Sequence, residues 1–78
     1  MEIKNFIEKV AEQFENVDNE LFKANTEFRK LDDWDSLTSL LIISMIDEQY
    51  KVQVSGEDIV KSETIQDLFN IVSTKIGR

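Results

Sequence analysis

The chain lacks cysteine, histidine and proline altogether, and only two of its 78 residues are glycine. Without cysteine it can form neither a disulfide nor a thiolate metal site, which fits a reducing compartment. Without histidine it lacks the usual general base and the commonest zinc ligand, and two glycines cannot build a glycine-rich phosphate loop. These absences argue against a stand-alone enzyme, and the length allows one domain with a single small core.

Positive charge is also scarce, because nine Lys and Arg residues stand against sixteen Asp and Glu residues, for a formal net charge of −7. Such a surface repels nucleic acid and favours partners with basic patches. The longest apolar run, Leu40–Ile43, is far too short to span a membrane. Residues 1–5 lack the basic and apolar regions of a secretory signal. We therefore expect one cytoplasmic domain over residues 1–78, without nucleic-acid binding or membrane insertion.

Three stretches carry apolar residues at helical spacing and are predicted to form the main helices. The first runs from about Glu2 to Asn16, and the second covers Ser36–Tyr50. The third starts near Thr64, where Thr64 and Asp67 have the spacing of a capping box. Gly77 is the expected stop of this last helix.

The segments between these helices have weaker periodicity. Residues 17–35 keep only scattered apolar side chains, which predicts a long connection that packs onto the core (Leu21, Phe22, Phe28, Leu31 and Trp34). Residues 51–54 alternate like a strand but have no second strand to pair with, so we expect an extended loop. Residues 56–61 are predicted to form a short helix. The sum is an all-α fold of three main helices plus a short helix before the last.

The helix over residues 36–50 is apolar on two sides. One side is expected to face the core (Ser39, Ile42, Ile43, Ile46 and Tyr50). The other side has leucines followed by acids (Leu37, Leu40, Leu41, Asp47 and Glu48). Either this second side is a binding surface or the long connection covers its leucines. We expect exposure for Leu37 and Leu41, and both alternatives stay open for Leu40.

The sequence Asp35-Ser36-Leu37 stands at the start of this helix. Asp and Ser are good N-cap residues, and unpaired N–H groups at a helix start favour a phosphate. Ser36 is therefore either a simple cap or a point where a phosphate-linked group is attached. The three residues alone do not distinguish these interpretations.

The chain as a whole resembles the acyl carrier proteins, which are phosphopantetheine-bearing carrier domains. The resemblance covers nearly the whole length and rests on five groups of residues (Asp35-Ser36-Leu37, Asp47-Glu48 with Tyr50, Val52 with Val54, Gly56–Ile59 and Thr64–Leu68). It implies a bundle of three main helices with a short helix before the last and a long first loop. It also implies a free-standing, non-catalytic carrier.

The resemblance assigns roles to the residues of the motif. A separate phosphopantetheinyl transferase would attach 4′-phosphopantetheine from coenzyme A to the Ser36 hydroxyl as a phosphodiester. Asp35 would hold the helix start and help to position the magnesium of the transferase, and Leu37 would dock into an apolar pocket of a partner. Acyl groups would then travel as thioesters on the attached arm. A chain without histidine and cysteine can serve this function, because the transferase and the arm supply the chemistry.

The partners implied are loading ligases, synthases and transferases with basic and apolar docking patches, met by the exposed side of the helix (Leu37, Leu40, Leu41, Asp47 and Glu48). Carriers of fatty acid synthesis usually have acids where this chain has Thr38 and Leu41. The difference favours a specialised lipid or polyketide pathway over housekeeping fatty acid synthesis. The alternatives are an aminoacyl or peptidyl carrier, of the D-alanyl or nonribosomal peptide type, and an unmodified acidic helical adaptor with the same fold.

Overall fold

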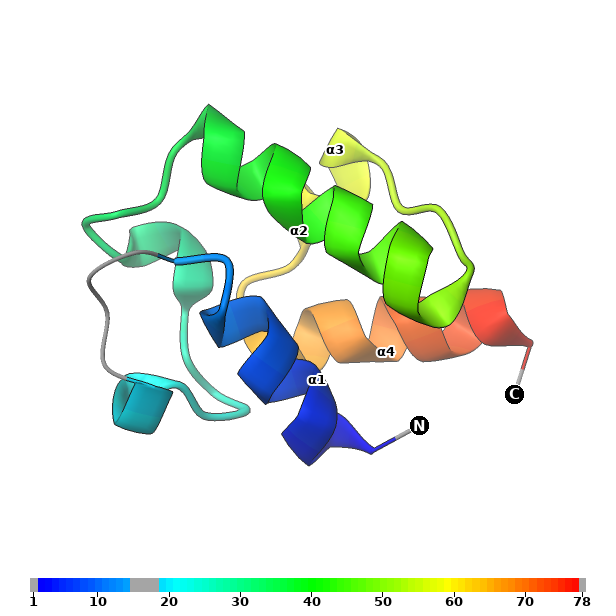
Figure 1. The fold of residues 1–78 in the computed structure, drawn as a ribbon, viewed down its shortest axis with the longest axis horizontal. Coiled ribbons are helices and arrows are strands. Elements are labelled where there is room, and N and C mark those ends of the chain that lie inside the picture. Colours follow the sequence, from blue (N-terminus) through cyan, green and yellow to red (C-terminus); the bar gives the residue numbers. More distant parts are fainter. Residues whose placement is uncertain (1, 15–18, 78) are drawn as a thin grey trace.

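The computed structural model describes residues 2–14 and 19–77, and within these ranges the chain is helical without strands (Figure 1). The elements follow in the order α1 (Ile3–Ala11), η1 (Asn19–Leu21), η2 (Phe28–Lys30), α2 (Ser36–Tyr50), α3 (Gly56–Lys61) and α4 (Ile65–Ile76), where η marks a short 3-10 helix. This confirms the all-α architecture with a short helix before the last and a long first connection. Among the described residues, no helix has the length and apolar character needed to cross a bilayer.

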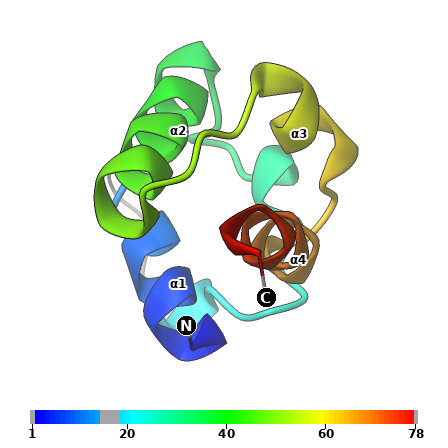
Figure 2. The same cartoon turned by 90° about the vertical axis from the view of Figure 1, so that its right-hand side faces the viewer.

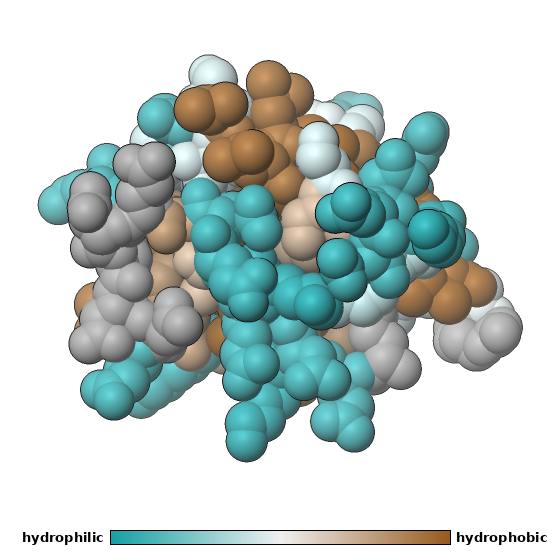
Figure 3. All heavy atoms as spheres, viewed as in Figure 1, coloured by the Kyte–Doolittle hydropathy of each residue, from teal (hydrophilic) through white to brown (hydrophobic). Residues whose placement is uncertain are grey.

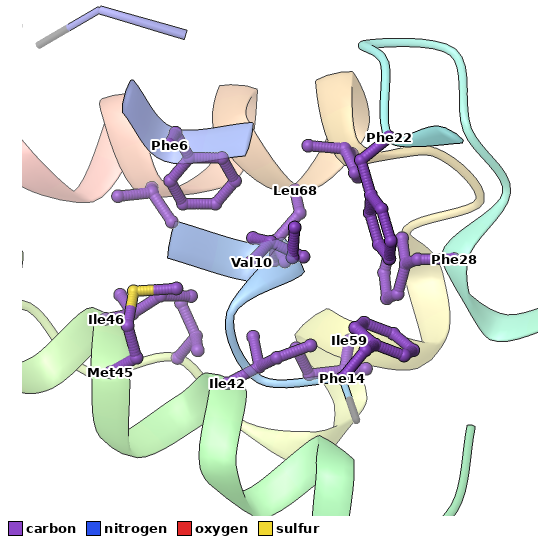
Figure 4. Close-up of a cluster of buried hydrophobic side chains, with 14 residues drawn as sticks. Phe6, Val10, Phe14, Phe22, Phe28, Ile42, Met45, Ile46, Ile59 and Leu68 are labelled. Atoms are coloured by element: carbon purple, nitrogen blue, oxygen red, sulfur yellow. The ribbon is translucent and has the colours of Figure 1, made fainter. Parts of the chain in front are cut away.

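The four α-helices surround one core. α1 packs against α2 and α4, and α3 also packs against α2 and α4, so that in the view of Figure 2 the helices enclose a common interior. Aromatic and aliphatic side chains from all four helices and from the long connection fill it (Figure 4). Burial of these side chains is the main stabilising term for a chain without disulfides.

Side-chain hydrogen bonds cap the starts of α2, α3 and α4. At α4, the Thr64 hydroxyl accepts from the Asp67 N–H at 3.2 Å, and the Asp67 carboxylate accepts from the Thr64 N–H at 3.1 Å, which confirms the predicted capping box. Ser55 and Asp58 form a second capping box at α3. Gly77 ends α4 with a φ of +90°, a left-handed conformation that glycine adopts without steric cost.

The predicted helix over residues 2–16 is too long. α1 ends at Ala11, and the next bonds are the tighter ones from Gln13 N–H to the Val10 carbonyl and from Phe14 N–H to the Ala11 carbonyl. This turn still brings Phe14 into the core, where its ring lies 5.1 Å from that of Phe22. Apolar spacing continued to Phe14 although the α-helical hydrogen bonds did not. Asn16 lies outside the described residues.

The long connection packs onto the core, as predicted, and it is also tied to α4. The backbone N–H groups of Ile65 and Gln66 donate to the carbonyls of Thr26 and Ala24 at 3.2 and 2.9 Å. These bonds pair N–H groups that the first turn of a helix leaves without partners. Phe22 and Phe28 are buried, but Leu21 is 64% exposed, so its predicted role as a core anchor was wrong.

At the C-terminal end of α2, the hydroxyl group of Tyr50 is buried without a hydrogen bond to the described residues. Tyr50 packs its ring 5.8 Å from that of Phe6, and its hydroxyl oxygen is buried with no hydrogen-bond partner among the described residues. The same burial raises the pKa of Tyr50 above its ordinary value.

We expect Tyr50→Phe to leave the free energy of unfolding unchanged or to raise it by about 1 kcal/mol, because it removes an unsatisfied buried polar atom and keeps the ring. Urea unfolding of both proteins measures this difference. A loss of stability would contradict the packing described for this hydroxyl.

Candidate functional site

Ser36 is the first residue of α2, and its side chain lies at the surface. Asp35 is the N-cap, with an extended backbone, and its Oδ1 accepts from the Thr38 N–H at 2.8 Å. The sequence placed α2 over the same residues, because Asp35 supplies a strong local start signal. The cap therefore fixes the backbone at Ser36, whose exposed side chain directly follows the exposed Asp35.

Thr38 contributes a second bond to the same carboxylate oxygen. Its Oγ1 lies 2.9 Å from Asp35 Oδ1 and 3.3 Å from the Asp33 carbonyl oxygen. Since a hydroxyl donates one proton, the shorter contact to the charged oxygen is the stronger one. The backbone and side-chain bonds from Thr38 lower the pKa of Asp35 below its ordinary value, so the carboxylate is ionised at neutral pH.

Sequence reasoning did not find this role of Thr38. The residue is only 7% exposed, so it lies under the surface rather than on it. Leu41, the other position that departs from the fatty-acid pattern, is exposed. A threonine three residues after an N-cap aspartate was the available signal, because that position faces the cap at the helix start.

The segment before Ser36 is anchored by Trp34. Its ring stands edge-on to that of Phe28 at 5.4 Å and lies 6.2 Å from that of Phe14. This confirms the expectation that Trp34 anchors the connection on the core. A surface pocket of 310 Å³ lies beside Trp34 and extends along the N-terminal part of α2. Its lining residues come from the turn after α1, the connection and α2 (Gln13, Asp32, Asp33, Trp34, Asp35, Leu37, Thr38 and Leu41).

Next to Ser36, α2 presents an apolar surface. Leu37, Leu40 and Leu41 are 63%, 60% and 40% exposed, and Figure 3 shows hydrophobic side chains gathered over α2. The described part of the connection, residues 19–35, leaves these leucines exposed, so Leu40 lies at the surface. Asp47 and Glu48 are exposed near the other end of the helix. We call this set the α2 surface (Leu37, Leu40, Leu41, Asp47 and Glu48).

The opposite side of α2 faces the core, as its periodicity indicated. Ile42 and Ile46 are fully buried, and Ile43 and Tyr50 pack against the core from partly buried positions. Met45 and Thr38 are buried as well, although the sequence analysis did not include them. Both flank the predicted core-facing side, so the buried strip on α2 is wider than expected.

The described residues contain no group of three or more acids that could hold a metal ion by themselves. Ser36 also has no histidine anywhere in the chain to activate it. A phosphodiester nevertheless fits at this serine, because the hydroxyl is exposed at the start of a 15-residue helix, where backbone N–H groups and the macrodipole favour phosphate.

Comparison with known proteins agrees with this geometry. Residues 5–72 match the sequence family described as the phosphopantetheine attachment site. The matched range includes Asp35-Ser36-Leu37 and most of every α-helix. A comparison with curated proteins gave no match.

Proposed function

The chain belongs to the phosphopantetheine attachment-site family, and from this premise we propose that Ser36 is the residue that carries the prosthetic group. Members of this family bind 4′-phosphopantetheine covalently, so the chain is a non-catalytic phosphopantetheine carrier. The observation that supports Ser36 is its position as an exposed hydroxyl on the first residue of α2, directly after the N-cap residue Asp35.

Loading of Ser36 is a substitution at phosphorus, performed by a phosphopantetheinyl transferase with coenzyme A. The bond from Ser36 Oγ to phosphorus forms, and the bond to adenosine 3′,5′-bisphosphate breaks with its electron pair. The hydroxyl proton passes to a base of the transferase. Asp35 fixes the start of α2 and, by analogy with the family, would help to position the magnesium of the transferase. When bound, the prosthetic group supplies a thiol that holds acyl groups as thioesters.

The α2 surface is the proposed docking site for partner enzymes, which would be transferases, loading ligases and synthases. The leucines beside Ser36 suit an apolar pocket, and Asp47 and Glu48 suit a basic patch. No basic residue occurs between Ser36 and Tyr50, so all the charged side chains of this helix are negative. Charges at the rim of an interface mainly raise association rates, which suits a carrier that must bind and release quickly.

For the cargo, we propose acyl intermediates of a specialised lipid or polyketide pathway. Leu41 supports this choice, because it places an exposed apolar side chain where fatty-acid carriers usually have an acid. Thr38 does not, since it is buried. An aminoacyl or peptidyl cargo is the alternative with the same apolar docking. The cytoplasmic location stays a prediction from composition.

The test of the proposed function is loading in vitro. We expect incubation with coenzyme A and a broad-specificity transferase to add one phosphopantetheine group to the intact mass of the wild-type protein. Absence of any mass gain with several transferases would contradict the proposal and favour an unmodified helical adaptor that binds partners through the α2 surface.

A charge placed on the α2 surface should impair docking without unfolding the domain. We expect Leu41→Glu to lower the loading rate and to change the free energy of unfolding by no more than about 1 kcal/mol, because the residue is 40% exposed and lies outside the buried core. Loading kinetics and urea unfolding measure the two effects.

Leu21→Glu is the matched control, since Leu21 is 64% exposed on η1, away from α2 in both Figure 1 and Figure 2. It should load at the wild-type rate. If Leu41→Glu destabilises the fold by about 2–4 kcal/mol, Leu41 is a core residue and its assignment to the α2 surface is wrong.

A further inference from the structure

The hydrogen bonds around Asp35 point to a residue that acts on Ser36 indirectly. Asp35 Oδ1 receives both the N–H and the Oγ1–H of Thr38, at 2.8 and 2.9 Å. The backbone bond is the ordinary N-cap contact that any residue except proline could make at this position. The hydroxyl bond depends on the side chain, and only serine and threonine can donate it with this geometry.

The burial of Thr38 restricts which side chains can make this second bond. Thr38 is 7% exposed, so its rotamer is held by packing, and among the described residues its hydroxyl contacts the Asp35 carboxylate and the Asp33 carbonyl. The two bonds converge on one oxygen and fix the plane of the carboxylate, while Asp35 itself remains exposed. An acid at position 38 could not donate this bond at neutral pH and would repel Asp35.

We propose that Thr38 is a positioning residue for the loading of Ser36: its buried hydroxyl orients the Asp35 carboxylate that a transferase meets beside the serine. The inference rests on the proposed function, because it concerns the same modification. Ser36 and Asp35 are adjacent at the start of α2, so the direction of this carboxylate defines part of the surface that the transferase recognises. Positioning groups of this kind act on the rate, since loading requires the reacting atoms to be aligned.

The test compares initial loading rates of Thr38→Val and Thr38→Ser with the wild type, using coenzyme A and one transferase. Valine keeps the shape and loses the hydroxyl, and serine keeps the hydroxyl and loses the methyl group. We expect Thr38→Val to load about fivefold more slowly through kcat, because the backbone bond still holds Asp35 in part. Thr38→Ser should load within about twofold of the wild type.

Unfolding measurements separate positioning from stability. If Thr38 has only a structural role, the order is reversed. Thr38→Ser is then the less stable and slower-loading variant, because serine leaves a small cavity and valine fills the site. Thr74→Val is the matched control, since Thr74 is exposed on α4 and its hydroxyl donates to the Asn70 carbonyl at 3.0 Å. It should load like the wild type.

The inference is overturned if Thr38→Val loads at the wild-type rate, or if Thr38→Ser is as slow as Thr38→Val. If Thr38→Val does not fold, the loading rates of Thr38→Ser and Thr38→Ala are compared instead. Both variants lack the methyl group, and only serine can donate a hydrogen bond to Asp35. Equal loading rates for these two variants refute the inference. Failure of the wild type to load refutes the proposed function itself, and the premise of this inference with it.

Discussion

Replacement of Ser36 with alanine is expected to abolish loading completely, so that the intact mass of the variant does not change under conditions that convert the wild type. No other group can substitute at that point, because the hydroxyl oxygen is the atom that forms the bond to phosphorus. The fold should persist, since Ser36 is exposed and Asp35 provides the cap of α2. We expect a change in the free energy of unfolding of no more than about 0.5 kcal/mol.

Ser44→Ala is the matched control for this experiment. Ser44 is another exposed serine on α2, further along the helix, and its loss should leave loading at the wild-type rate. Intact mass spectrometry of the three proteins before and after the reaction gives the result. A mass gain in Ser36→Ala would place the attachment on another hydroxyl and refute the assignment of Ser36.

Among the variants proposed for this protein, Phe28→Ala is expected to lower the free energy of unfolding most. Phe28 is fully buried, it comes from the long connection, and it supports Trp34 just before the capped start of α2. Phe28→Ala should lower the free energy of unfolding by about 3–5 kcal/mol, because the lost burial and the cavity add together. Small domains have a total stability near the lower end of about 5–15 kcal/mol, so a large unfolded fraction should appear on mild heating.

Leu21→Ala serves as the comparison for Phe28→Ala, because it truncates another large apolar residue of the same connection. Leu21 is 64% exposed, so we expect a change in the free energy of unfolding within about 0.5 kcal/mol. Urea unfolding followed by circular dichroism measures both variants. Similar losses for the two would mean that the connection is not packed as the structure describes.

Local signals accounted for much of the fold and for the centre of the site. The bounds of α2 were predicted as observed, and the Thr64–Asp67 capping box starts α4 as expected. These features depend on hydrogen bonds between residues three or four positions apart, so a short stretch of sequence is enough to predict them. The same reasoning extended α1 beyond Ala11, because the burial of Phe14 in a tighter turn continues the apolar spacing.

The sequence by itself determined the main helices and placed a serine at the start of the second one, because capping residues and apolar period are local properties. The carrier assignment came from the resemblance of the chain to a family, which the match over residues 5–72 shows. Tertiary structure decided which side chains of the connection are buried. It also decided that Thr38 is buried with its hydroxyl against Asp35. Leu21 and Phe28 are both large apolar residues of the connection, yet Phe28 is fully buried and Leu21 is 64% exposed. That difference arises from contacts between segments distant in sequence, such as the bonds from α4 to Ala24 and Thr26, and no periodicity encodes them.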